Sequence, residues 1–175
     1  MRALKIRLAV SSRHGSTWES GEAVAEVLRG SGFQVDLADP EDVEGVEGYD
    51  AVVLGSSVYV GRWAAGARAM AERFAPALSA MPLWLFSSGP VGNPPAPSEE
   101  IEEAADLGRR LGARTHTTFT GRLSRPALSL AERAVVSLLH VPYGDFRDWA
   151  AIERWAASVA AELHGEEIRR VPLAR

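Results

Sequence analysis

The sequence predicts an α/β fold: a doubly wound, mostly parallel sheet with helices on both faces. Short apolar runs alternate with stretches that repeat apolar residues at helical spacing, and this alternation is typical of parallel sheets. The runs at 49–57 and 83–88 contain continuous apolar cores, as strands buried on both faces do. The chain has 175 residues, 46% of them hydrophobic, so we expect residues 1–175 to form one domain.

The first half of the chain supplies three of the five expected strands. Residues 4–10 form the first, and a helix is expected from about residue 16. An alternating strand follows at 33–38, and the buried strand at 49–57 comes next. After it we expect a single helix whose apolar face holds Ala67, Met70, Ala71, Phe74 and Leu78.

The second half supplies the other two strands and two more helices. The strand at 83–88 is followed by a helix from Ser98 to about Leu111, and threonine and aromatic residues predict a strand at 115–121. The last helix begins at about Asp148. Three tryptophans lie on predicted strand or helix faces, so we expect them in the core: Trp84, Trp149 and Trp155.

Composition excludes several classes of function. The net charge is −4 and basic residues form no cluster, which argues against binding to nucleic acid. There is no cysteine, so disulfides and thiolate metal sites are excluded, and the scattered histidines show no metal-ligand spacing. No apolar stretch approaches the length that spans a membrane, and the N-terminus lacks a signal peptide's apolar centre. We therefore expect a cytoplasmic protein without stable membrane insertion.

Three loops rich in glycine and serine follow predicted strands. They are "SSRHGST" after the first strand, "GSSVYVGRW" after the third and "SSGPVGNP" after the fourth. Ligands of open α/β sheets bind outside the carboxyl ends of the strands, so these loops mark the expected site.

The stretch "SSRHGSTWES" at 11–20 has two interpretations. Ser16 and Glu19 match the S-x-x-E capping box, which satisfies the free amides of a helix start without any ligand. Alternatively, hydroxyl groups and amides at a helix N-terminus bind a phosphate, which the helix dipole also favours. Three Gly/Ser loops at three strand ends favour the second interpretation.

The other common phosphate and catalytic motifs are missing. The first loop contains neither the G-x-G-x-x-G of dinucleotide-binding folds nor the G-x-x-x-x-G-K-[ST] of nucleotide triphosphatases. The stretch "LFSSGPVG" lacks the G-x-S-x-G of α/β-hydrolases. No nucleophile or acid–base pair emerges, so the catalytic residues stay unknown.

The loops "SRHGST" and "GSSVYVG" resemble the two flavin-binding loops of the flavodoxin family. The resemblance implies a flavodoxin-like five-stranded sheet of order 2-1-3-4-5 and FMN as cofactor, with Tyr59 stacked on the flavin ring and Trp63 as its substitute. Two groups follow by resemblance: Ser12, His14, Gly15, Ser16 and Thr17 at the phosphate, and Ser56, Ser57, Val58, Tyr59 and Gly61 at the ring. We add Arg13 from the first loop and Ser88, Gly89 and Gly92 from the third.

Several stretches, among them "MPLWLFSSGPV" and "DFRDWAAIERWA", look like a long flavodoxin branch that includes menaquinone-dependent protoporphyrinogen dehydrogenase. Members carry an extra segment before the last helix, and residues 121–148 occupy that place here. Residues 128–141 form an amphipathic helix in this segment, with one face made of Leu128, Ala131, Val135, Leu138 and Leu139. This helix covers the sheet edge, or it is a lid over the flavin or a surface for a quinone or a partner protein.

Three functions follow from these observations. The first is an FMN-dependent oxidoreductase that acts on a small organic substrate or a quinone; Arg13 and Arg62 would suit an anionic substrate. The second is a flavodoxin-type electron carrier that docks on a redox protein partner. The third is a binding module that keeps the fold without FMN.

Overall fold

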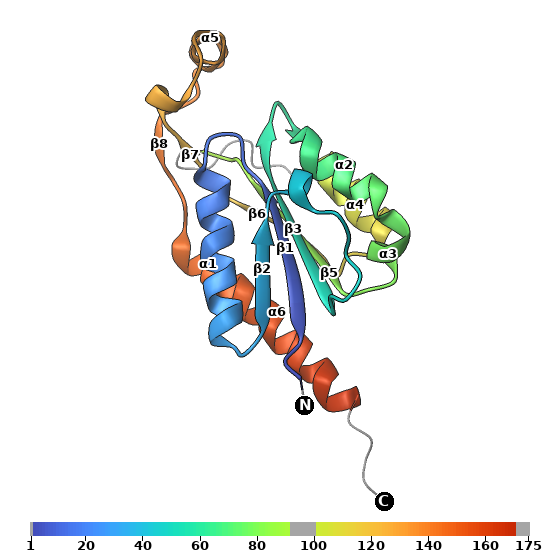
Figure 1. Ribbon diagram of the computed structural model, residues 1–175. Coiled ribbons are helices and arrows are strands. Elements are labelled where there is room, and N and C mark those ends of the chain that lie inside the picture. The colour runs from blue at the N-terminus through green and yellow to red at the C-terminus, as the bar shows by residue number, and fades with distance from the viewer. Residues whose placement is uncertain (1, 92–100, 171–175) are drawn as a thin grey trace, which may run out of the picture.

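Five parallel strands form the central sheet of the computed structural model, which describes residues 2–91 and 101–170 (Figure 1). The sheet order is β2-β1-β3-β5-β6, which confirms the expected order when the parallel strands are counted along the chain. A short strand β4 (Arg62–Trp63) pairs antiparallel with β3. The parallel strands are β1 (Lys5–Ser11), β2 (Gln34–Ala38), β3 (Ala51–Tyr59), β5 (Leu83–Ser88) and β6 (Thr115–Phe119).

The register of the sheet brings the serine-rich strand ends together. Ser11 of β1 pairs with Ser56 of β3, and Ser57 pairs with Ser88 of β5. The apolar residues of these strands precede their serines in sequence, so the core occupies the body of the sheet and the polar residues share its carboxyl edge.

Helices cover both faces of the sheet. The helices α1 (Ser16–Gly30) and α6 (Trp149–Arg170) pack on one face (Figure 1). The other face is covered by α2 (Ala65–Arg73), α3 (Ala75–Ser79) and α4 (Glu102–Leu111). Side chains of a strand alternate between these two cores, so Val53 packs toward α1 while Val52 packs toward α2.

Two expectations about helices and core residues are wrong. The single helix expected from Ala67 to Leu78 is divided into α2 and α3 at Phe74. Pro76 explains the break, because proline has no amide hydrogen and is tolerated in the first turn of a helix but not in its interior. Trp149 is 40% exposed instead of buried, because it begins α6 and lies under the guanidinium of Arg147.

The segment between β6 and α6 forms an arm beyond the carboxyl ends of the strands (Figure 1). Its stem is the antiparallel pair of β7 (Arg122–Leu123) and β8 (Gly144–Asp145). The stem carries a 3-10 turn at Arg125–Ala127 and the helix α5 (Leu130–Leu138). In the described part of the chain, no helix is both long and apolar enough to cross a membrane.

Candidate functional site

A cavity of about 340 Å³ lies where the sheet ends and the arm begins. Its walls are the loops after β1, β3, β5 and β6 together with α5, so it occupies the edge where the sequence predicts the site. The volume is within the range of pockets that bind small molecules and cofactors. Of the expected site residues, the cavity is lined by Ser12, Arg13, His14, Ser16, Thr17, Ser57, Val58, Tyr59, Gly61, Ser88 and Gly89.

The loop after β1 turns sharply into α1. Gly15 precedes the helix with a φ of 85°, a left-handed conformation that glycine adopts without strain, and its amide donates a 3.0 Å hydrogen bond to Ser12 Oγ. The turn places Ser16 and Thr17 in the first turn of α1, on the cavity wall. The Ser16 hydroxyl is buried and has no hydrogen-bond partner among the described residues.

The capping box that Ser16 and Glu19 could have formed, the less favoured interpretation of this stretch, is not present. The residue that caps α1 is Gly15, and within residues 2–91 and 101–170 no side-chain cap hydrogen bond forms at this helix start. Glu19 instead forms an ion pair with Arg147. A buried hydroxyl without a partner costs free energy, and amides at a helix N-terminus attract an anion. The loop therefore fits a phosphate group better than it fits simple capping.

The loop after β3 is the tip of a tight hairpin with β4. Val60 and Gly61 form the turn with φ angles of 49° and 73°. A β-branched residue with positive φ is strained, and such strain is found mainly at functional sites. Tyr59 precedes the turn, is 38% exposed and lines the cavity, and the guanidinium of Arg13 lies 4.3 Å from the centroid of its ring.

Two expected residues of this hairpin lie outside the cavity. Ser56 is fully buried, and its hydroxyl donates to the carbonyl of Ser57 and accepts from the amide of Ala64. Trp63 is 2% exposed and donates from Nε1 to Ser87 Oγ, so it is a core residue and no substitute for Tyr59.

The loops after β5 and β6 form the floor of the cavity. The amide of Gly89 donates to the carbonyl of Phe119, and the amide of Gly121 donates to the carbonyl of Pro90. These bonds hold Ser88 and Gly89 at the cavity wall. Gly92, expected in this loop, lies outside the described residues.

The arm supplies cavity residues that the sequence did not assign to the binding site, although Leu128, Val135 and Leu139 were expected on an apolar helix face. Its helix α5 lies at the cavity, not along the sheet edge, so the lid interpretation of residues 128–141 fits the structure better. A second S-x-x-E pattern at Ser129 and Glu132 could have located the start of α5, since it forms a complete capping box there. The additional lining residues of the arm are Gly121, Arg122, Leu123, Leu128, Glu132, Val135, Val136, Leu139 and Val141.

The apolar face expected for this helix is correct only in part. Leu128 is buried and Val135 lines the cavity. Leu138, however, is 77% exposed, and the buried positions of α5 are Glu132 and Val136. The helix has only 9 residues and faces the cavity with one side, so its other side, with Leu130 81% and Leu138 77% exposed, remains in solvent.

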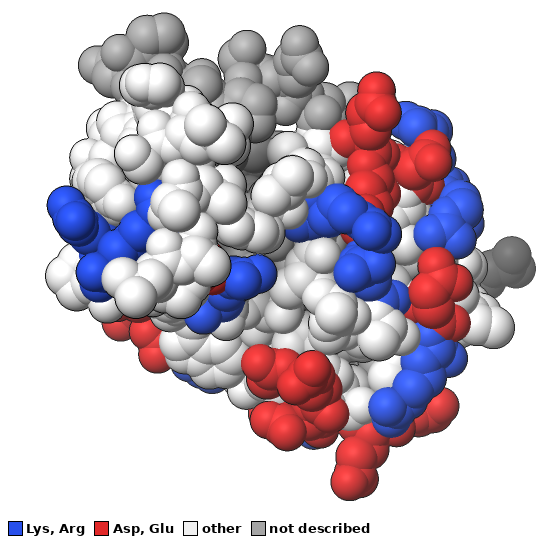
Figure 2. All heavy atoms as spheres, turned by 90° about the horizontal axis from the view of Figure 1, so that it is seen from above, with Lys and Arg blue, Asp and Glu red and all other residues white. Residues whose placement is uncertain are grey.

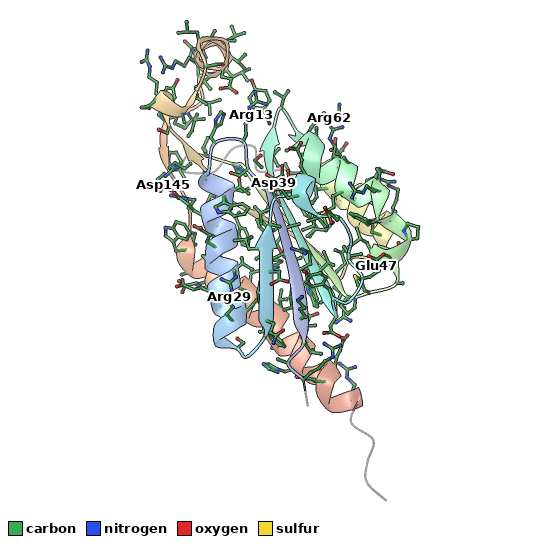
Figure 3. The ribbon with its side chains drawn as sticks, in the orientation of Figure 1. Arg13, Arg29, Asp39, Glu47, Arg62 and Asp145 are labelled. Carbon is green, nitrogen blue, oxygen red and sulfur yellow. The ribbon has the colours of Figure 1, made fainter. Side chains whose placement is uncertain are left out.

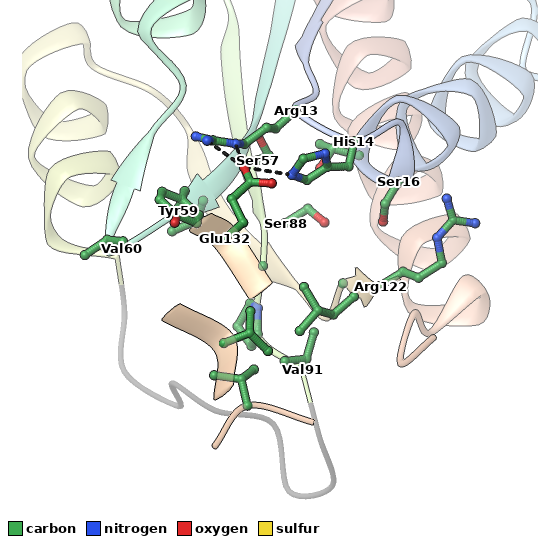
Figure 4. Close-up of a pocket in the computed structure, with 18 of the residues that line it drawn as sticks. Arg13, His14, Ser16, Ser57, Tyr59, Val60, Ser88, Val91, Arg122 and Glu132 are labelled. Carbon is green, nitrogen blue, oxygen red and sulfur yellow. Dashed lines mark hydrogen bonds and ion pairs between the residues drawn. The ribbon is translucent and has the colours of Figure 1, made fainter. Parts of the chain in front are cut away.

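The charges at the cavity are paired. Glu132 Oε1 accepts a 2.7 Å hydrogen bond from Arg13 Nε and lies 3.4 Å from His14 Nε2 (Figure 4). The hydrogen bond from the Ser129 amide is the main cause of the lowered pKa of Glu132, and Arg13 and His14 lower that pKa further. Glu132 is therefore ionised at neutral pH.

Arg62 does not join Arg13 at the cavity. It lies beside α2, away from α5 (Figure 3), and donates a 2.9 Å hydrogen bond to Glu103. Viewed from the carboxyl ends of the strands, basic and acidic side chains are interspersed around uncharged surface (Figure 2). These arrangements give no concentrated positive field for an anionic substrate.

The stem of the arm is fastened to the start of α1. The side chain of Arg147 is 4% exposed, pairs with Asp145 at 2.7 Å and also binds Glu19. Hydrogen bonds from Arg147 are the main cause of the lowered pKa of Asp145. These ion pairs therefore hold the arm against the start of α1, next to the loop of residues 12–17.

Comparison with known proteins adds two findings. A family model described as "Flavodoxin domain" matches residues 8–148. No curated protein sequence is significantly similar to the chain.

Solved structures resemble this fold at low sequence identity. A flavodoxin from the domain Archaea gives a TM-score of 0.60 at 14% identity, covering 92% of this chain and 99% of its own. A Streptococcus pneumoniae flavodoxin gives 0.62 at 16% identity, covering 90% and 99%. Rubredoxin oxygen:oxidoreductase from Desulfovibrio gigas gives 0.63 at 13% identity, but the chain spans only 36% of that protein's length.

Proposed function

The chain belongs to the flavodoxin domain family, and we propose that it is an FMN-dependent oxidoreductase acting on a small organic substrate or a quinone. The observation that carries the proposal is the buried, unpartnered hydroxyl of Ser16 at the N-terminus of α1. It is the kind of donor that a phosphate group would satisfy, and it lies on the wall of a cavity large enough to hold part of a flavin.

The residues divide the cavity into a polar end and an apolar end. Ser16, Thr17 and the first amides of α1 would hold the phosphate, with the helix dipole favouring its charge. Tyr59 and Val58 would line the ring, while α5 shields that end from water. A bound FMN would supply two-electron redox chemistry between a reduced substrate and an acceptor such as a quinone, whose reduction also takes up two protons.

The apolar wall favours an uncharged, apolar substrate. Val135, Val136, Leu139 and Val141 come from the arm and face the cavity. The two arginines expected to attract an anion are paired with carboxylates. These observations support a quinone-type acceptor, as in the protoporphyrinogen and quinone dehydrogenases that the sequence resembles. A flavodoxin-type electron carrier is the second candidate, since solved flavodoxins share the fold.

FMN binding is the first test. We expect FMN to bind stoichiometrically with quenched fluorescence, and the double variant Ser16→Ala/Thr17→Ala to raise the Kd by roughly 100-fold, because two hydrogen bonds to a charged phosphate are lost. The variant Ser158→Ala removes a hydroxyl from the exposed side of α6 and leaves the Kd unchanged. Absence of FMN binding at high micromolar concentration would contradict the proposal.

Reoxidation kinetics separate the two functions. The reduced holoprotein is mixed anaerobically with a water-soluble quinone or with a redox protein such as cytochrome c. The oxidoreductase proposal expects faster reoxidation by the quinone, and Val136→Asp slows that reaction because it puts a charge in the apolar wall. Preferential reoxidation by the protein would support the carrier instead.

A further inference from the structure

The contact between α5 and the loop after β1 depends on one carboxylate. Among the described residues, Glu132 is the one side chain of α5 that hydrogen-bonds to residues 12–17. Its side chain is 10% exposed, and it receives Arg13 through both Nε at 2.7 Å and a terminal nitrogen at 2.6 Å. A nearly buried carboxylate is tolerated only when it is paired, so the pair ties the helix to the loop.

Arg13 extends this connection to the second flavin loop. Its guanidinium lies 4.3 Å from the centroid of the Tyr59 ring, so one side chain contacts both Glu132 and Tyr59 (Figure 4). The loop after β1, the hairpin after β3 and α5 meet at this point. Arg13 therefore links these three parts of the cavity wall.

The cavity is open although Glu132 and Arg13 are paired. Both residues belong to its lining, and its volume in this state is about 340 Å³. The pair therefore does not fill the site, and a ligand and the closed position of α5 are compatible.

We propose that Glu132 is a positioning residue: by binding Arg13 it fastens α5 over the cavity as a latch that retains FMN. The inference rests on the proposed function for its ligand. When the pair is broken, α5 moves away from the loop more often, and FMN leaves faster. The direct electrostatic effect of Glu132 on FMN affinity has the opposite sign, because a carboxylate beside a phosphate weakens phosphate binding.

The variants are chosen to separate the latch from the fold of α5. Glu132→Gln keeps an oxygen that can accept from the Ser129 amide, so it keeps the capping box while removing the charge. Ser129→Ala does the reverse, since it removes the cap and leaves the ion pair. Arg13→Gln and the double variant Glu132→Gln/Arg13→Gln complete a thermodynamic cycle.

The release of FMN from the holoprotein is followed as fluorescence recovery after dilution. We expect Glu132→Gln and Arg13→Gln each to raise the release rate by about 10-fold, the double variant to be no faster than the single ones, and Ser129→Ala to change it less than 2-fold. Slower release of FMN from Glu132→Gln would show that the Glu132 carboxylate mainly repels the phosphate, and it would overturn the latch. Equal effects of Ser129→Ala and Glu132→Gln, or multiplying effects in the double variant, would overturn it as well.

Hydrogen exchange tests the latch without FMN. Amides of residues 130–138 should exchange several-fold faster in Glu132→Gln and Arg13→Gln than in the unmodified protein, while amides of the sheet stay unchanged. If the protein bound no FMN but showed this pattern, the proposed function would fail and the fastening of α5 would stand. Unchanged exchange in both variants would overturn the fastening itself.

Discussion

Gly55 shows how one missing side chain shapes the centre of the sheet. It lies in β3, and a Cβ built there would come within 2.1 Å of the Phe86 ring. Phe86 is fully buried and packs against Phe119 and Trp155, so it has little room to move. The ring therefore occupies space that any other residue at position 55 would need.

Gly55→Ala should lower the free energy of unfolding by about 1–3 kcal/mol, because the methyl group overpacks the core. Gly30→Ala is the matched control: nothing lies within 4 Å of an added Cβ there, and alanine is a better helix former, so stability should rise by roughly 0.5–1 kcal/mol. Urea unfolding measures both changes. Equal stability of the two variants would contradict the packing described for β3.

Two neighbouring strands are connected at the end opposite the cavity by a polar cluster. Tyr49, in the turn before β3, donates a 2.7 Å hydrogen bond to Asp36 of β2, and Lys5 of β1 lies 3.1 Å from the same carboxylate. The hydrogen bond from Tyr49 is the main cause of the lowered pKa of Asp36, followed by Lys5. Burial is the main cause of the raised pKa of Tyr49.

Tyr49→Phe should raise the pKa of Asp36 toward its ordinary value, because the main donor is lost. A carboxyl whose pKa is lowered by folding stabilises the protein above its unfolded pKa, and this stability is lost as the pH falls through the folded value. The variant should therefore lose less stability between pH 7 and pH 3. A carboxyl titration by NMR and urea unfolding at both pH values test this, with the exposed Tyr143→Phe as control.

At the scale of the whole molecule, the cavity joins parts of the chain that are far apart in sequence. Its walls come from residues 12–17, 57–61, 88–91 and 121–141. The parallel sheet brings the first three together at one edge, and the arm closes the fourth side. A ligand that filled the cavity would touch several of these segments at once, so its binding would be thermodynamically linked to global folding.

FMN should therefore raise the free energy of unfolding of the whole domain. At a free concentration 100 times the Kd, the expected gain is about 2.7 kcal/mol. Riboflavin, which has the ring without the phosphate, should give a smaller gain at the same concentration, because it cannot satisfy Ser16 and the amides of α1. Thermal unfolding at fixed protein concentration measures both gains, and equal gains would argue against a phosphate site in this loop.

Much of the fold and part of the site follow from local sequence. The parallel sheet was predictable because the runs at 49–57 and 83–88 read as strands buried on both faces, whereas the strand order came from the resemblance to the flavodoxin family. The loops at its carboxyl edge were predictable for the same reason, and the expected FMN agrees with the family to which the chain belongs. The break at Pro76 and the exposure of Trp149 were missed, since helical spacing alone was read as one helix and as a core face.

The sequence by itself determined the sheet, the loops at its edge and the choice of hydroxyl and glycine residues in them. These features depend on hydrophobic periodicity and on short-range backbone preferences, both of which neighbouring residues determine. Only the tertiary structure decided that Ser16 lacks a capping role and that Glu132 meets Arg13, 119 positions away. Such contacts depend on how separate elements pack against one another, and no local sequence pattern specifies which distant residues will meet.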